Sequence, residues 1–158
     1  MASRGSLRWL ATAGMVAASL VLAGCSSFGP PTSGACIDWV YFESPADAAD
    51  EADAVIVGTV ESSAGSTTYL DLPATKWHVS VDRWIKGGDG SRTVVVTSLP
   101  RSCGDTHDSV ADAVDAGPVV LFLRDGKSGW ETLTPFQGLI PAERDGNLPS
   151  EWPADMHD

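Results

Sequence analysis

The sequence predicts a small all-β domain, a five-stranded antiparallel barrel accompanied by one short helix. From residue 54 onward, short runs rich in β-branched residues alternate with turn-forming Gly, Pro, Asp and Ser. In one run Trp77, Val79 and Val81 alternate with polar residues, which is the two-residue period of a half-buried strand. Gly58 interrupts another run and indicates the bend or bulge of a sheet that coils into a barrel.

The first predicted element is a short helix after Ser44. Ser44 is a candidate N-cap and Pro45 suits the first helical position. Asp47 places a negative charge in the first turn, where the helix dipole favours it. We expect this helix to end near Asp53.

Five strands are expected to follow the helix. Their predicted ranges are 54–61, 75–86, 93–99, 117–124 and 130–140. The fourth run is apolar on both faces, which favours a central position, and Pro135 interrupts the fifth. Residues 100–116 are predicted as a loop that carries Cys103, with a helical turn around residues 110–114.

The first 25 residues have the layout of an export signal. Arg4 and Arg8 precede an uncharged run of 14 residues, 9–22, and a membrane-spanning helix needs roughly 20 apolar residues. The run ends in Leu-Ala-Gly-Cys at residues 22–25, which has the form of a lipobox. With these features the chain resembles a bacterial lipoprotein precursor.

This resemblance implies the location of the protein. Residues 1–24 would be a signal peptide, and Cys25 would receive a diacylglycerol thioether and become the new N-terminus. The domain would then sit at the extracytoplasmic face of the cell membrane, anchored by lipid. Three lysines and one asparagine, against many Ala, Gly, Asp and Val, are typical of a GC-rich genome and suggest an actinobacterium. An ordinary signal peptide with an incidental cysteine is the alternative.

Residues 52–140 carry a second resemblance. The segments 52–60, 79–87 and 117–123 resemble the OB-type barrel of bacterial proteins related to the TIMP and netrin-module fold. The resemblance implies the fold and not an activity. The metalloprotease inhibitors of that fold use a free-amine cysteine at the mature N-terminus as a reactive ligand. Here that position is Cys25, which the lipobox assigns to lipid, so inhibition is not carried over.

The remaining chain divides into three parts. Residues 25–35 are rich in Ser, Gly and Pro and are predicted to be a flexible tether. Residues 36–145 form the barrel domain, and residues 146–158 form a loosely ordered tail. Two cysteines, Cys36 and Cys103, are left after lipidation, and thiols of an exported domain usually pair, so we predict a disulfide between them. A thiol that serves as a nucleophile or metal ligand is the alternative.

Charge limits the classes of partner. The precursor has a formal charge of −11, and loss of Arg4 and Arg8 with the leader would give −13. A chain this acidic, with no basic run, is a poor candidate for nucleic acid or for binding anionic lipid through its own surface. The acidity is explained by solubility, and a cationic partner is the alternative.

The segment 103–108 is the densest group of candidate ligands. It contains Cys103, Asp105, His107 and Asp108. Because zinc normally needs three or four protein ligands, and a disulfide would remove the thiolate, we predict no metal site and no cofactor. No nucleophile or phosphate-binding motif is present in the sequence, and we predict no catalytic residues.

Tryptophan is the last informative feature. The mature chain contains five, at positions 39, 77, 84, 130 and 152. OB barrels often bind ligands by aromatic stacking, so we predict that at least one of Trp39, Trp84 and Trp152 is substantially exposed beside an apolar neighbour. Trp77 is expected to point inward with Val79 and Val81. Tryptophans that fill or seal the barrel are the alternative.

The sequence therefore predicts a lipid-anchored binding or interaction module of the cell envelope, with Trp39, Trp84 and Trp152 as its candidate surface and a protein or glycan as its partner. The alternative is an envelope enzyme with a site around Asp105, His107 and Asp108. Convergence of these three side chains in one pocket would favour the enzyme.

Overall fold

The structure, a computed structural model, describes residues 36–157. The predicted signal peptide, Cys25 and the predicted tether lie outside the described residues. The elements in chain order are α1 (Pro45–Glu51), β1 (Ala54–Tyr69), β2 (Leu72–Lys86), β3 (Thr93–Ser98), α2 (Ser109–Asp112), β4 (Val119–Gly126), β5 (Gly129–Thr132), β6 (Leu139–Pro141) and the 3₁₀ turn η1 (Ala154–His157). None of the helices in residues 36–157 is long and apolar enough to span a bilayer.

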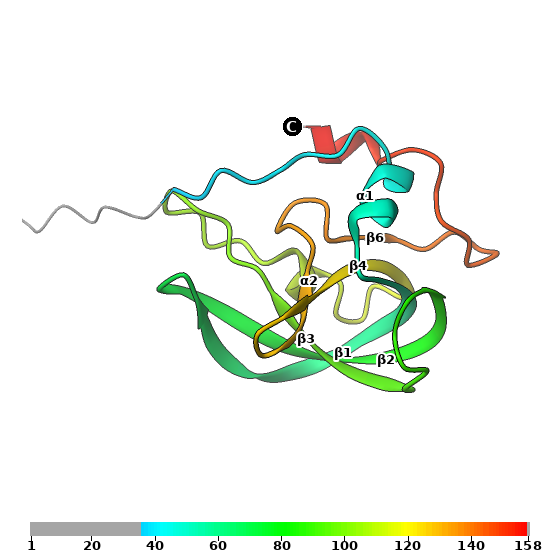
Figure 1. Cartoon of the computed structure of the whole chain (residues 1–158), viewed down its shortest axis with the longest axis horizontal. Coiled ribbons are helices and arrows are strands. Elements are labelled where there is room, and N and C mark those ends of the chain that lie inside the picture. Colours follow the sequence, from blue (N-terminus) through cyan, green and yellow to red (C-terminus); the bar gives the residue numbers. More distant parts are fainter. Residues whose placement is uncertain (1–35, 158) are drawn as a thin grey trace, which may run out of the picture. The chain divides into compact units, whose positions relative to one another are not determined.

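Five strands close into a barrel, which confirms the predicted fold class (Figure 1). The order around the ring is β1-β2-β3-β5-β4, and β4 pairs again with β1. One pair, β3–β5, is parallel, so the prediction of a wholly antiparallel barrel is wrong. The predicted fifth strand is in fact two, β5 and β6, because the chain turns at Pro135. The turn is held by the Gln137 N–H, which donates to Thr134 Oγ1 at 2.9 Å.

The first two strands form a hairpin that is longer than predicted. β1 continues to Tyr69 through a stretch of Ser, Thr and Gly whose sequence has no apolar period. The predicted irregularity at Gly58 is confirmed, since the register with β2 shifts between Val57 and Gly58. Glycine is required there because a Cβ would collide with the carbonyl oxygen of Ser80.

The barrel has two cores, one on each face of β1 and β4. Ala54 and Ile56 of β1 point into the barrel, whereas Val55 and Val57 point outward. Val79 belongs to the inner core, and the half-buried Trp77 and Val81 pack against it, so these residues point inward as predicted. The outer core is covered by α1 and by Trp152 from the C-terminal segment. The central position predicted for residues 117–124 is explained by these two buried faces.

The short helix is confirmed, and it ends at Glu51. Ser44 and Asp47 form a capping box, in which each side chain accepts a hydrogen bond from the backbone N–H of the other. At the other end, Lys86 Nζ donates to the carbonyls of Ala49 and Asp50 at 2.9 and 2.8 Å. The lysine thus satisfies carbonyls that have no partner within the helix.

Candidate binding surface

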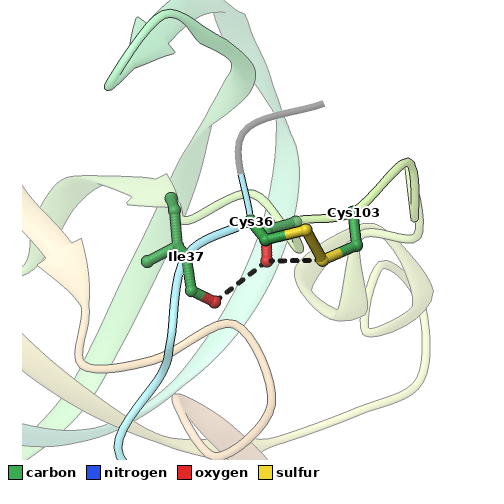
Figure 2. Close-up of a disulfide and its surroundings, with 4 residues drawn as sticks. Cys36, Ile37 and Cys103 are labelled. Atoms are coloured by element: carbon green, nitrogen blue, oxygen red, sulfur yellow. Dashed lines mark hydrogen bonds between the residues drawn. A yellow bond between two sulfur atoms is a disulfide. The ribbon is translucent and has the colours of Figure 1, made fainter. Parts of the chain in front are cut away.

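The predicted disulfide joins Cys36 to Cys103, with Cα atoms 4.7 Å apart (Figure 2). Next to the bridge, Ser102 Oγ donates a hydrogen bond to the carbonyl of Ile37 at 3.0 Å. Both cysteines are therefore committed to the bridge, and neither is available as a nucleophile or metal ligand. The bridge and this hydrogen bond fix residues 36 and 37 against the loop that follows β3.

The extended chain is fixed a second time at Phe42. The buried amide of Gln137 accepts from the Phe42 N–H at 2.8 Å and donates to the Phe42 carbonyl at 2.9 Å. Trp152 Nε1 donates to the same carbonyl at 2.9 Å. We call residues 36–43 the anchored segment, because it is held near both ends. It runs as a single extended path from the disulfide to α1 (Figure 1).

Between its two fixed ends the anchored segment presents apolar side chains to solvent. Val40 is 63% exposed and Tyr41 is 60% exposed. Tyr41 stacks on Phe136, with ring centroids 5.5 Å apart. The guanidinium carbon of Arg101 lies over the Phe136 ring, 4.8 Å from its centroid. Within residues 36–157, the backbone N–H and C=O groups of residues 38–41 make no hydrogen bond.

The tip of the β1–β2 hairpin lies beside the anchored segment. Trp39 stacks on Tyr69 with ring centroids 5.9 Å apart. The next residue, Leu70, is 63% exposed and has a φ of 47°, which is rare for a bulky side chain. We call Trp39, Val40, Tyr41, Tyr69 and Leu70 the apolar ridge. It brings together two parts of the chain that are 30 residues apart in sequence.

Arg124 holds the hairpin tip through a hydrogen bond to Tyr69. Its guanidinium donates to the Tyr69 hydroxyl at 2.6 Å and to Glu131 Oε2 at 3.0 Å. Burial opposes the charge of Arg124, but the hydrogen bonds and attractions to Tyr69 and Glu131 outweigh it, so its pKa is raised. Arg124 therefore stays cationic and holds the Tyr69 ring where Trp39 can stack on it.

Carboxylates are concentrated along the anchored segment and α1. Six exposed acidic residues lie in the anchored segment and around α1: Asp38, Glu43, Asp47, Asp50, Glu51 and Asp53. No Lys, Arg or His occurs between Cys36 and Lys76. Two hollows flank the segment, one of about 850 Å³ lined in part by Val40, and one of about 480 Å³ lined in part by Tyr41. The ridge is thus an apolar strip with shallow cavities on an acidic surface.

The three predicted surface tryptophans have different positions. Trp152 is only 6% exposed and packs edge-on against Phe122, so its assignment to the binding surface is wrong. Trp39 and Trp84 are half-buried, so the prediction that at least one of the three is substantially exposed is also wrong. Trp84 packs on Trp130 and donates from Nε1 to the Ser91 carbonyl, because the glycine turn after β2 folds over its ring.

The predicted candidate residues near Cys103 make separate contacts. Asp108 is the N-cap of α2, and its carboxylate also accepts from Ser98 Oγ and Trp77 Nε1 at 2.6 and 3.1 Å. His107 Nε2 lies 2.9 Å from Asp112, and Asp105 pairs with Arg101 at 3.2 Å. The three residues line a hollow of about 370 Å³, but their side chains are bonded to different partners.

Local hydrogen bonding explains the ionisation of Asp105. The His107 backbone N–H donates to its carboxylate at 2.9 Å, and with help from Arg101 this lowers the pKa of Asp105. The nearby Ser109 hydroxyl donates to the carbonyl of Pro135. A nucleophilic serine must donate its hydroxyl hydrogen bond to a general base. Ser109 donates to a backbone carbonyl instead, so Ser109, His107 and Asp105 do not make the contacts of a catalytic triad. No group of three metal-ligating side chains occurs in the described part of the chain.

Sequence reasoning missed the residues that now define the surface. Val40 and Tyr41 lie in an irregular segment, where exposure cannot be read from a periodic pattern. Gln137 gave no signal, because its partner Phe42 is 95 residues away. Leu70 follows a Thr-rich run with no apolar alternation, which did not predict a strand.

The chain matches no protein-family model, no curated protein and no solved structure.

Proposed function

We propose that this protein is a lipid-anchored interaction module of the bacterial cell envelope. The lipobox at residues 22–25 would attach Cys25 to the membrane, and the barrel would be displayed on the extracytoplasmic side. The disulfide supports this location, because such bridges form and persist in oxidising compartments. The binding surface we propose is the apolar ridge, which replaces the tryptophan set predicted from the sequence.

The observation that carries the proposal is the exposure of Val40 and Tyr41 on a segment held near both ends. Large exposed apolar side chains mark interaction sites when they lie together on a polar surface. A segment already fixed by a disulfide and by Gln137 loses little conformational entropy when a partner binds. Aromatic residues such as Trp39 and Tyr41 are also favoured anchors in interfaces.

The side-chain contacts favour a binding module over an envelope enzyme. Asp108 caps α2 and holds Trp77 and Ser98, so its carboxylate has a structural role. The His107 imidazole contacts Asp112, and the Asp105 carboxylate is bonded to Arg101 and to the backbone N–H of His107; both side chains lie at the protein surface. All three residues line the hollow of about 370 Å³, which is the arrangement expected of an enzyme site, but the carboxylates of Asp105 and Asp108 are already engaged by hydrogen bonds within the fold.

The anchor is tested by the substitution Cys25→Ser. If Cys25 carries the lipid, the variant should lose metabolic labelling with a fatty-acid probe and partition into the aqueous phase of a detergent extraction. The wild-type chain and a Ser26→Ala variant should label and partition into detergent. Unchanged membrane association of Cys25→Ser would contradict the lipid anchor.

The binding surface is tested by photo-crosslinking in the native bacterium. A benzophenone amino acid is placed at position 40 of the full-length protein, with position 95 as the control. Val95 is also exposed, at 41%, but lies on β3 opposite His78 of β2, several residues from the hairpin turn that carries Leu70. We expect an adduct of defined size from position 40 only. Equal adducts from both positions, or none from position 40, would contradict the proposal.

A further inference from the structure

We infer that the partner of the apolar ridge is a basic protein, and that it adds an extended strand along residues 38–41. This inference rests on the proposed function, and it names both the partner class and the mode of binding. Backbone geometry supports the mode, and the distribution of charge supports the partner class.

The backbone of residues 38–41 is available for pairing. Its N–H and C=O groups have no hydrogen-bond partner in the described residues, although the segment is extended and held at Cys36 and Phe42. An exposed extended segment with free backbone groups is a template for another strand. The alternate side chains of such a strand would meet Val40 and the two hollows beside the segment.

Charge restricts the occupant. Asp38 and Glu43 lie within the anchored segment, and four more carboxylates lie on or beside α1. The cations beside these carboxylates are already engaged, Arg101 with Asp105, Arg124 with Glu131, and Lys86 with two carbonyls of α1. A second copy of this chain would bring two strongly acidic surfaces together, which like-charge repulsion opposes. A segment rich in Lys or Arg is therefore the complementary occupant, since opposite potentials steer association and set specificity.

The test uses the full-length protein in detergent and three blocked heptapeptides. One alternates Lys with Val, one replaces each Val by Pro, and one replaces each Lys by Glu. The Pro peptide keeps the charge but cannot form a regular ladder of hydrogen bonds. We expect the Lys-Val peptide to bind at least tenfold more tightly than the Lys-Pro peptide, with weaker binding as salt rises. We expect no binding of the Glu-Val peptide.

Two variants locate the pairing. Val40→Pro removes one free backbone N–H and should lower affinity for the Lys-Val peptide about tenfold without changing that for the Lys-Pro peptide. Val40→Thr keeps the N–H and should retain most of the difference between the two peptides. Amide hydrogen exchange should slow at residues 38–41 when the Lys-Val peptide is added, and unchanged thermal unfolding of both variants shows that the fold is intact.

The outcomes separate this inference from the proposed function. Equal affinity for the Lys-Val and Lys-Pro peptides would overturn strand addition. Protection in residues 59–69 of β1, the part that extends beyond its pairing with β4, instead of at residues 38–41 would also overturn it. Failure of both basic peptides to bind, or a protease-resistant glycan adduct at position 40, would overturn the basic protein partner. In each case an adduct from position 40 alone would still support a binding surface at the ridge.

Discussion

The anchored segment and the C-terminal segment, residues 146–157, are both irregular, yet their side chains are used in opposite ways. The C-terminal segment buries Trp152 in the outer core, where it touches Phe122. The anchored segment is fixed near its ends by the disulfide and by Gln137, and it leaves Val40 and Tyr41 in solvent. The two meet where Trp152 Nε1 donates to the Phe42 carbonyl. Burial of an aromatic residue in an irregular segment thus marks a structural role, and exposure between fixed ends marks a candidate for binding.

The covalent link should make the largest contribution to stability. The double substitution Cys36→Ser with Cys103→Ser opens a loop spanning 67 residues and should lower the free energy of unfolding by about 4 kcal/mol. Chemical denaturation of the oxidised wild type and the variant measures it. The difference should vanish when the wild type is reduced. A loss below about 1 kcal/mol would mean that the anchored segment is held by its noncovalent contacts alone.

Trp152 should make the second largest contribution to the free energy of unfolding. Trp152→Ala removes a buried indole and its hydrogen bond to Phe42, and should cost about 3 kcal/mol by denaturation. Trp152→Phe keeps much of the packing and loses the hydrogen bond, so it should cost less. An unchanged free energy of unfolding in Trp152→Ala would contradict the contrast between the two segments. The C-terminal segment would then contribute no more to stability than the exposed part of the anchored segment.

Gln137 sharpens the comparison, because it holds the anchored segment by hydrogen bonds alone. Gln137→Ala leaves the Phe42 N–H without a partner in a part-buried position and should cost about 2 kcal/mol. Hydrogen exchange at the Phe42 amide should also become faster. As a control, Gln137→Glu keeps the acceptor for the N–H but loses the donor to the carbonyl. Retained protection of Phe42 in Gln137→Ala would show that the disulfide fixes the segment without this amide.

Val40 should show the smallest effect. Because its side chain is 63% exposed, Val40→Ser should change the free energy of unfolding by less than about 0.5 kcal/mol, as should Val95→Ser. Capture of the envelope partner should nevertheless fall for Val40→Ser and not for Val95→Ser. A clear loss of stability in Val40→Ser would assign the residue to the fold and remove the main support for the ridge.

Much of the fold could be predicted, because it depends on local patterns. The capping residues of α1, the alternation in β2 and the two apolar faces of β4 all depend on neighbours within a few residues. The parallel β3–β5 pair could not be predicted, since its direction is set by how the intervening chain returns. The same holds for the site. The Cys36–Cys103 bridge followed from counting cysteines, whereas the exposure of Val40 and the burial of Trp152 depend on distant packing.

The turn at the tip of the β1–β2 hairpin offers a route to protein engineering. Leu70 and Asp71 both have positive φ, 47° and 65°, in a two-residue turn of the kind that favours Asn-Gly. Leu70→Asn with Asp71→Gly would relieve a conformation that costs L-residues about 1–2 kcal/mol each. The natural pair is thus suboptimal for this hairpin. A thermostabilised variant made this way would lack the Leu70 side chain. A biosensor or scaffold built on this domain would therefore gain thermal stability and lose part of the apolar ridge.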